Sequence, residues 1–581
     1  MPRSHTLSLS LALLVLAAAP VAAQATHIRG LPPPHTDDSL AVEQLLDSLP
    51  LAARVAQLVM PWIPGGYAAS DDSAFTVAQR WVDSLRVGGI IVSIGSPLDI
   101  ASRLNRLQLR SPLPLLMASD LESGSSFRLN GGTPFPSNMG IAATGREEDA
   151  YEVGRVTALE GRAVGIHLTF SPVADVNNNP ENPIINTRSF GEDPALVARL
   201  VAATVLGIQD HGMLATAKHF PGHGDTGTDS HITVPVIGAG WSRLDSVELM
   251  PFRAAVGAGV SFVMSGHLVL PKLQGESGRP ATLDPAILTG VLRDSLGFQG
   301  LVVTDALDMG AVVQKYGAGE AAVLAFLAGS DLLLMPADPG QAISAMTQAV
   351  ESGRVTYERL ERSVRRVVFL KWRLGLFRQR TVPLDSIPEI VGGARFQASA
   401  RDIATRSIVL ASDSTGTIDS LRAAPRALTL VTYGEDNAGS VGNVLARQLR
   451  ATGHRVTMFR LWPASGPESL DSARALIRKT PYVVFAIAVR TKENKGHLNI
   501  PEALARLVDE TSRRRRTAIV SLGSPYIASQ LEHARSYLLA WSANSVSEWA
   551  AGRALSTLVP ITGRLPVRLP PAFPVGYGLL R

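Results

Sequence analysis

Residues 300–305 read Gly-Leu-Val-Val-Thr-Asp, a short apolar run rich in β-branched residues that ends at a carboxylate. Such a run predicts a buried strand, and the longer amphipathic stretch after it predicts a helix. Seven further runs of this kind alternate with amphipathic stretches: residues 57–61, 89–93, 114–119, 167–172, 214–218, 261–265 and 331–335. Eight strand-and-helix units in succession are typical of an α/β fold of the TIM type, a (β/α)8 barrel.

Polar residues stand where several of these strands are expected to end. Asp120 follows the third run, Lys218 and His219 close the fifth, and Asp305 follows the seventh. A single aspartate after a strand could simply cap the next helix. The carboxyl ends of barrel strands meet on one rim, however, so polar groups at several strand ends predict a site for chemistry there.

The chain beyond the barrel predicts a second, smaller domain. A barrel over residues 37–377 is followed by a linker with prolines and glycines, residues 378–401, and by a C-terminal domain over residues 402–581. In this domain β-type runs alternate with helical segments: residues 427–432, 455–460, 482–488, 517–522 and 537–541. The alternation predicts a smaller parallel α/β sandwich. The domain carries no glycine-rich phosphate loop, which favours a scaffold role.

The first 23 residues resemble a secretory signal peptide. Arg3 and His5 precede an apolar run over residues 7–18, and small residues at positions 21–23 suit cleavage. We therefore expect a periplasmic or secreted protein. No later segment reaches ~18 uninterrupted apolar residues, so we expect no stable membrane insertion after cleavage.

Charge and cysteine content exclude several classes of protein. The net charge of +5 over 581 residues comes mainly from scattered arginines rather than from a basic face, so we expect no nucleic-acid partner. The run from Arg513 to Arg516 is interpreted as a solvated helix end. The chain contains no cysteine, which rules out disulfides and thiolate chemistry.

The densest group of reactive side chains is residues 218–231, Lys-His-Phe-Pro-Gly-His-Gly-Asp-Thr-Gly-Thr-Asp-Ser-His. Its proline and glycines predict a loop that folds over a pocket. Asp229 lies two residues before His231, so the carboxylate can orient the imidazole and stabilise its charged form, which makes the histidine a good proton shuttle. A metal site formed by His219, His223 and His231 is the alternative, although no His-x-x-x-His face or cysteine pair supports it.

This loop resembles the signature of the β-N-acetylglucosaminidase branch of glycoside hydrolase family 3. Further motifs follow in the order expected for that family: Asp120-x-Glu-x-Gly with Arg128 downstream, Ser171-Pro-Val-Ala-Asp175, Asn186-x-Arg-Ser-Phe-Gly-Glu-Asp-Pro194 and Val303-Thr-Asp305-Ala-Leu-Asp-Met309. The resemblance covers the whole barrel. It extends more weakly to the second domain and to Phe573-Pro-Val-Gly-Tyr-Gly near the C-terminus.

The resemblance implies a retaining hydrolase that releases terminal β-linked N-acetylglucosamine (GlcNAc) from peptidoglycan fragments or related glycans. It identifies Asp305 as the nucleophile that forms a covalent glycosyl-enzyme, and Asp229 with His231 as the acid/base dyad. The residues implied to grip the hydroxyls of the terminal sugar are Asp120, Arg188, Lys218 and His219. No cofactor or metal is implied, and the expected partner is a small carbohydrate, a GlcNAc-terminated glycan or muropeptide.

The motifs depart from the family pattern on one strand. Many members have Glu-Gly-Gly after the aspartate of the third strand, whereas this chain has Glu122-Ser123-Gly124, a change that bears on the rim of the sugar site and on aglycone preference. Three alternatives stay open. They are a family 3 β-glucosidase, a GlcNAc phosphorylase, whose histidine would not repel an incoming phosphate, and a non-catalytic muropeptide-binding protein. Neither the natural aglycone nor the oligomeric state follows from these motifs.

Overall fold

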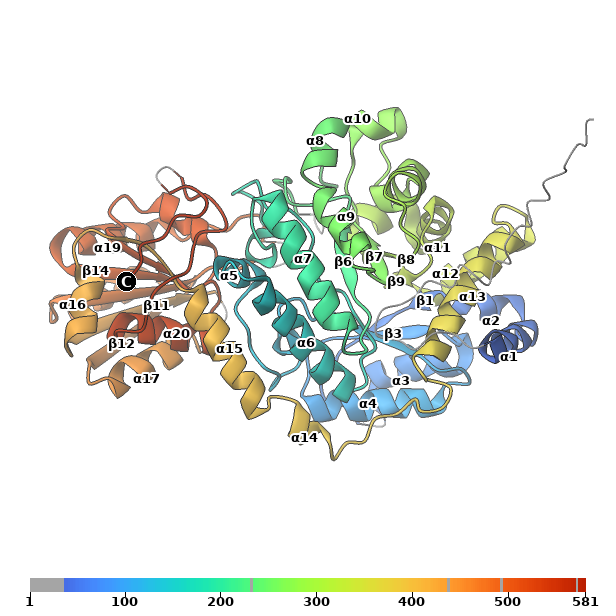
Figure 1. The fold of residues 1–581 in the computed structure, drawn as a ribbon, viewed down its shortest axis with the longest axis horizontal. Coiled ribbons are helices and arrows are strands. Elements are labelled where there is room, and N and C mark those ends of the chain that lie inside the picture. Colours follow the sequence, from blue (N-terminus) through green and yellow to red (C-terminus); the bar gives the residue numbers. More distant parts are fainter. Residues whose placement is uncertain (1–35, 70, 230–233, 436–438, 492–494, 571–572) are drawn as a thin grey trace, which may run out of the picture.

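The computed structural model describes residues 36–581 except 70, 230–233, 436–438, 492–494 and 571–572. Figure 1 shows two bodies side by side, with the barrel in blue to yellow and the second domain in orange to red. The predicted signal peptide lies outside the described residues. Within the described part of the chain, no helix combines the length and the apolar character needed to cross a bilayer.

The first domain is a closed parallel barrel. Its strands are β1 (Val59–Met60), β2 (Trp62–Ile63), β3 (Gly89–Val92), β4 (Leu116–Ser119), β5 (Leu168–Thr169), β6 (Thr216–Phe220), β7 (Phe262–Ser265), β8 (Leu301–Thr304) and β9 (Leu333–Leu334). Strands β2 to β5 and β6 to β8 form two parallel runs, and β1 pairs with β9. Bridges from Leu168 to Leu214 and from Val303 to Leu332 join these pieces, and Leu333 N donates to Leu58 O at 2.8 Å to close the ring. Each of the eight predicted runs overlaps one strand of the barrel.

Helices cover the outside of this barrel, as Figure 1 shows. The helices of the first domain are α1 (Thr36–Asp47), α2 (Leu51–Ala56), α3 (Ser73–Arg80), α4 (Pro97–Arg110), α5 (Asn138–Ala143), α6 (Glu147–Ala163), α7 (Pro194–Gln209), α8 (Trp241–Ser246), α9 (Met250–Gly257), α10 (Pro271–Gln274), α11 (Gly310–Ala328), α12 (Pro339–Glu351) and α13 (Tyr357–Arg373), with π-helical turns over Trp81–Leu85 and Ala286–Ser295. Local signals set several of their starts. Asp193, for example, caps α7 by accepting a hydrogen bond from Ala195 N, and a proline occupies the first turn.

The last barrel helix is fixed to the sheet by a buried carboxylate. Asp331, at the start of the eighth predicted strand, forms ion pairs with Arg293 at 2.9 Å and with Arg366 at 3.3 Å, and it accepts a hydrogen bond from Val302 N. Burial alone would raise the pKa of Asp331, but the surrounding guanidinium groups lower it below the ordinary value. The negative charge of Asp331 therefore links α13, the π-helical segment Ala286–Ser295 and β8 at the amino end of the barrel.

The second domain is built on one six-stranded sheet. Its strands are β10 (Val409–Asp413), β11 (Ala427–Gly434), β12 (Arg455–Leu461), β13 (Tyr482–Ala488), β14 (Arg516–Ser521) and β15 (Ser536–Leu539), in the order β10-β15-β14-β13-β11-β12. The five predicted runs correspond to β11 to β15, which are parallel. Strand β10 was not predicted, and it pairs antiparallel with β15 at the edge of the sheet. The prediction relied on the alternation of strands and helices, and β10 lies outside these repeated units, so the pattern did not reveal it.

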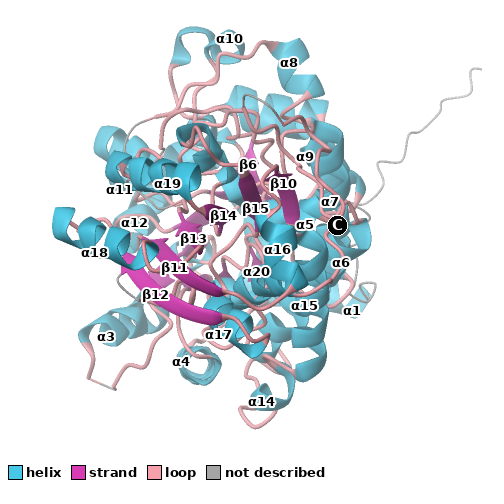
Figure 2. Cartoon of the chain, turned by 90° about the vertical axis from the view of Figure 1, so that its left-hand side faces the viewer, coloured by secondary structure: helices cyan, strands magenta, loops and turns pink. Residues whose placement is uncertain are grey.

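Helices lie on both faces of this sheet. They are α16 (Thr417–Ala423), α17 (Asn443–Ala451), α18 (Pro467–Ile477), α19 (Glu502–Arg514) and α20 (Ser545–Ser556). Helices α16 and α17 contact α20, whereas α18 contacts α19, and Figure 2 shows the strands between these groups. Successive residues of β13 enter opposite cores, with Val484 in one and Phe485 in the other. The predicted α/β sandwich after a barrel is therefore confirmed.

The segment between the domains carries two helices, α14 (Ile387–Ile390) and α15 (Ala394–Ser407). Helix α15 packs against α5 and α6 of the barrel and against α20 of the second domain. Arg406 of α15 pairs with Asp149 at 2.6 Å, and Trp541 Nε1 donates to Ser407 O at 2.7 Å. The two domains thus share packing and hydrogen bonds along this helix.

Candidate active site

The carboxyl ends of the barrel strands bring the predicted polar residues to one rim. Asp120 follows β4, Lys218 and His219 lie in the second half of β6, and Asp305 follows β8. Arg188 comes from a short helical turn, Asn186–Arg188, between β5 and α7. Strand and loop positions thus place these side chains where a barrel carries its chemistry.

Two cations and two carboxylates form a compact network at the centre of this rim. Lys218 Nζ lies 2.7 Å from Asp120 Oδ1 and 2.8 Å from Glu122 Oε1. Arg188 binds Glu122 in a bidentate manner, through Nη2 to Oε1 at 2.7 Å and through Nε to Oε2 at 2.9 Å. Because bidentate guanidinium–carboxylate pairs fix direction as well as charge, the network holds the lysine and arginine heads in place.

Glu122 is a site residue whose role the sequence did not show. Burial would raise its pKa, but Arg188 and Lys218 bring the pKa of Glu122 well below its usual range. A carboxylate held ionised by two cations is a poor proton donor near neutral pH, so the structure favours a positioning role for Glu122 over that of a general acid. Its place in the motif Asp120-x-Glu122 was visible in the sequence, whereas its bond to Arg188, 66 residues away, was not.

His219 is oriented by a second buried carboxylate, Asp175. The two are joined by His219 Nδ1 and Asp175 Oδ2 at 2.7 Å, and the backbone N of His219 donates to Asp175 Oδ1 at 3.1 Å. A carboxylate only accepts, so the proton of this contact lies on Nδ1. The Nε2 atom of His219 then faces Arg188 Nη2 at 3.4 Å. Asp175 thus fixes the orientation of the His219 ring.

Asp305 is half-buried and held in an ionised state. Burial raises its pKa, but His219, His267 and the backbone N–H of Ala306 together lower the pKa of Asp305 below the ordinary value. Ala306 N donates to Asp305 Oδ1 at 2.8 Å. His267 supports the same turn, because its Nε2 lies 2.8 Å from Ala306 O and its Nδ1 lies 2.9 Å from Thr282 Oγ1. An anionic carboxylate on a fixed turn is suited to nucleophilic attack.

The loop after β6 is anchored firmly at its root. His223 N donates to Asp175 Oδ1 at 2.7 Å, and Asn182 Nδ2 donates to His223 O at 2.9 Å and to Gly224 O at 3.0 Å. A Cβ on Gly224 would lie 1.8 Å from Val176 O, so only glycine fits there. The loop leads to Asp229, which is buried. Its predicted partner His231 lies outside the described residues.

The alternative interpretation of this loop is a metal site formed by His219, His223 and His231, of which the structure describes the first two. His223 Nδ1 lies 2.7 Å from Thr226 Oγ1, and burial lowers the pKa of His223 to about 4. His219 is engaged by Asp175 through Nδ1. Among the residues that the structure describes, the group of His, Asp and Glu close enough to share an ion is Asp509, Glu532 and His533 of the second domain, away from this loop.

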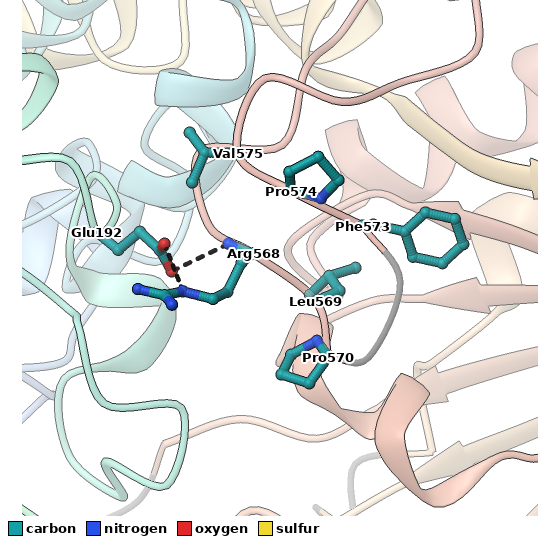
Figure 3. A pocket seen from close by; sticks show the side chains of 7 residues that line it. All are labelled: Glu192, Arg568, Leu569, Pro570, Phe573, Pro574 and Val575. Carbon is teal, nitrogen blue, oxygen red and sulfur yellow. Dashed lines mark hydrogen bonds and ion pairs between the residues drawn. The ribbon is translucent and has the colours of Figure 1, made fainter.

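The second domain reaches the segment that carries Arg188. Asn177 Nδ2 donates to the hydroxyl of Tyr526 at 3.1 Å, and Glu192 pairs with Arg568 at 2.8 Å. Figure 3 shows this ion pair at one side of a pocket of about 450 Å³. The residues that line the pocket are Glu192, Arg568, Leu569, Pro570, Phe573, Pro574 and Val575. The turn that follows Arg188 is therefore fastened to the second domain.

Comparison with known proteins identifies the family. The model of the glycosyl hydrolase family 3 N-terminal domain matches residues 50–370. The chain is 32% identical over 505 residues to a β-N-acetylglucosaminidase/β-glucosidase of Cellulomonas fimi, covering 83% of this chain and 88% of the relative. The chain belongs to glycosyl hydrolase family 3. This family 3 chain is an α/β glycoside hydrolase with a barrel and a sandwich domain.

Further relatives support the same assignment. A β-hexosaminidase A of Pseudoalteromonas piscicida is 37% identical over 308 residues, covering 49% of this chain and 51% of that protein. The structure of a family 3 β-N-acetylglucosaminidase from Paenibacillus sp. matches with a TM-score of 0.81 at 32% identity, covering 90% of this chain and 99% of that one. A β-glucoside phosphorylase, BglX, matches with a TM-score of 0.81 at 26% identity, covering 93% and 98%.

The role of Glu122 can be tested by Glu122→Gln, which keeps the shape but removes the charge. We expect kcat/KM to fall about 100-fold, the cost of leaving one buried cation without its carboxylate. The loss should be equal for an aryl glycoside and for a disaccharide, because Glu122 positions cations and moves no proton. Glu148→Gln, at a highly exposed glutamate on α6, is the control and should leave kcat/KM unchanged. A much larger loss on the disaccharide would assign Glu122 to proton transfer instead.

Proposed function

We propose that this family 3 enzyme hydrolyses terminal β-linked N-acetylglucosamine with retention of configuration. The observation that carries the proposal is the ionised, half-buried Asp305 at the end of β8, in the field of His219 and Lys218. A carboxylate that stays anionic beside a polar cradle can attack an anomeric carbon. The similarity to β-N-acetylglucosaminidases and β-hexosaminidases favours this sugar.

The reaction proceeds in two steps. In the first, Asp305 attacks the anomeric carbon and forms a covalent glycosyl-enzyme while His231 protonates the departing oxygen. In the second, His231 removes a proton from water, which attacks the same carbon and releases the sugar with its configuration retained. Asp229 orients His231 and stabilises its charged form. Asp120, Arg188, Lys218 and His219 hold the hydroxyls of the terminal sugar through charge-assisted hydrogen bonds.

The natural substrate that we propose is a peptidoglycan fragment or related glycan with GlcNAc at its non-reducing end. The predicted signal peptide supports action outside the cytoplasm, in the periplasm or the medium. The half-exposed Asp120 lies at the open side of the ion network, whereas the side chain of Lys218 is 3% exposed. The side of the network that carries Asp120 is therefore where we expect the terminal sugar to bind.

A phosphorylase is the second candidate, because the β-glucoside phosphorylase BglX shares the fold and 26% identity over 93% of this chain. The two functions differ only in the molecule that attacks the glycosyl-enzyme. Water gives the free sugar, and phosphate gives the sugar 1-phosphate. A histidine acid/base carries no negative charge to repel phosphate, so the dyad is compatible with both.

Product analysis separates these functions. The enzyme is incubated with chromogenic β-glycosides of GlcNAc, GalNAc and glucose and with muropeptides, with and without phosphate, and the products are resolved by mass. We expect free GlcNAc in both conditions, at a rate that phosphate and prolonged chelation leave unchanged, because Asp305 and His231 replace a Lewis acid. Sugar 1-phosphate as the main product would assign a phosphorylase, and faster release of glucose a β-glucosidase.

The nucleophile is tested by Asp305→Ala, which should abolish turnover while the thermal unfolding transition is kept, since a rim carboxylate contributes little to the core. In the unchanged enzyme, a mechanism-based fluorosugar should label Asp305, as peptide mass mapping would show. The control is Asp294→Ala, which removes an exposed aspartate of the π-helical segment before β8 and should retain activity. A label on another residue, or inversion at the anomeric carbon, would contradict the assignment.

The acid/base role of His231 is tested with leaving groups of different basicity. His231→Ala should lose far more rate on a disaccharide than on a nitrophenyl glycoside, because phenolate departs largely unaided. The covalent intermediate should then accumulate, giving a burst of nitrophenol before a slow steady state in stopped-flow measurements. Asp229→Ala should change the rates in the same direction but less, because it orients the imidazole. Equal loss on all substrates would exclude the role.

A further inference from the structure

Cationic side chains gather at the amino ends of the second-domain strands. The register places Ala427 of β11 beside Arg455 of β12, and Tyr482 of β13 beside both Leu428 and Arg516. The residues that precede or begin these strands therefore lie at one end of the sheet, where the amino ends of its parallel strands meet. We call the cations at this end the basic edge. Its members are Arg426, Arg455, Arg478, Lys479, Arg513, Arg514, Arg515, Arg516 and Arg535.

The basic edge concentrates charge that is spread out in the sequence. The whole chain has a net charge of +5. Because nine positive charges lie at this one end of the sheet, acidic residues outnumber basic ones in the remainder of the chain. All of its members except Arg426 are exposed. Two acidic residues lie among these cations: Glu532, which pairs with Arg513 at 3.4 Å, and Asp509 of α19, which lies beside Glu532 and His533. The interpretation of the arginines as scattered holds for the sequence but is wrong for this surface.

Local contacts hold part of the basic edge in place. The ring of Tyr482 lies between the guanidinium groups of Arg426, at 5.6 Å, and Arg516, at 5.9 Å. Arg516 Nη1 also donates to Ser420 Oγ of α16 at 2.7 Å, and Arg515 Nη2 donates to Arg478 O at 3.3 Å. Asp419, the acidic residue of α16, pairs with Arg581 at 3.2 Å. Like charges are thus kept close together, although Arg513 is paired with Glu532.

This edge faces away from the barrel. The carboxyl end of β14 leads to Tyr526, which bonds to Asn177 of the barrel, so the amino ends of the parallel strands point in the opposite direction. Figure 1 shows α16, which Arg516 contacts, at the end of the molecule farthest from the barrel. An extended surface could therefore bind the basic edge and leave the barrel rim accessible.

We propose that the basic edge docks this enzyme on an anionic phospholipid membrane. Five strand ends at spacings of ~4.8 Å spread the cations over roughly 20 Å, a width suited to several headgroups. None of the exposed large hydrophobic side chains among the described residues lies in its loops, so binding is electrostatic and peripheral, without insertion. The loops also present no exposed aromatic platform of the kind on which bases of single-stranded nucleic acids stack.

Vesicle sedimentation of the full chain after signal removal tests the proposal. Vesicles of phosphatidylcholine mixed with phosphatidylglycerol should bind the protein at low salt and release it at high salt, whereas pure phosphatidylcholine vesicles should not bind it. The test variant replaces Arg478, Lys479, Arg514 and Arg515 by serine. At about five-fold for each charge, the apparent affinity for anionic vesicles should fall by several hundred-fold.

A matched variant controls for net charge. Replacing the exposed barrel arginines Arg199, Arg253, Arg354 and Arg365 by serine removes the same charge elsewhere and should leave vesicle binding within a few-fold of the unchanged protein. Both variants should keep glycosidase activity, so the outcome is independent of the proposed reaction. Equal vesicle binding by both variants, or no binding by the unchanged protein, would overturn the proposal. Tighter binding to duplex DNA than to the vesicles would also overturn it.

Discussion

The ion network of Asp120, Lys218, Glu122 and Arg188, which is largely buried, is the constraint on which the site depends. Removing charged groups from water is costly unless each finds a partner of opposite charge with good geometry. The four groups come from the ends of β4 and β6 and from the turn before α7, so they meet only when these neighbouring parts of the barrel pack in their observed register. Pairing of these strands therefore also builds the polar cradle.

Buried polar groups next to this network are also paired. Asp175 satisfies His219 and the root of the following loop at once, and that loop leads to Asp229. The neighbouring groups then decide the protonation state of Asp305. Burial alone would raise its pKa, whereas these neighbours lower the pKa below the ordinary value. The ionised state of Asp305 is in this sense set by its neighbours. The turn after Arg188 is in turn held by the second domain, through Glu192 and Arg568, which makes that domain a support of the site.

The second domain uses the two ends of one parallel sheet in different ways. The carboxyl end of β14 meets the barrel through Tyr526, whereas the amino ends carry a concentrated set of exposed arginines. Parallel pairing produces this polarity, because it collects all strand starts on one side and all strand ends on the other. Such an arrangement allows one end to stabilise the catalytic domain while the other end remains free to bind an anionic surface.

The sequence by itself determined the strands of the barrel apart from β2, the parallel strands of the sandwich and the order of the motifs along the rim, because apolar periodicity and turn residues are local signals. The antiparallel strand β10 escaped it, since an edge strand is specified by its partner β15 rather than by its own pattern. The tertiary structure alone decided that Glu122 bonds Arg188 and that Asp175 orients His219. It also gathered arginines separated by up to 109 positions, Arg426 to Arg535, on one edge. Pairing of charges depends on distance in space, and only the closed fold sets that distance.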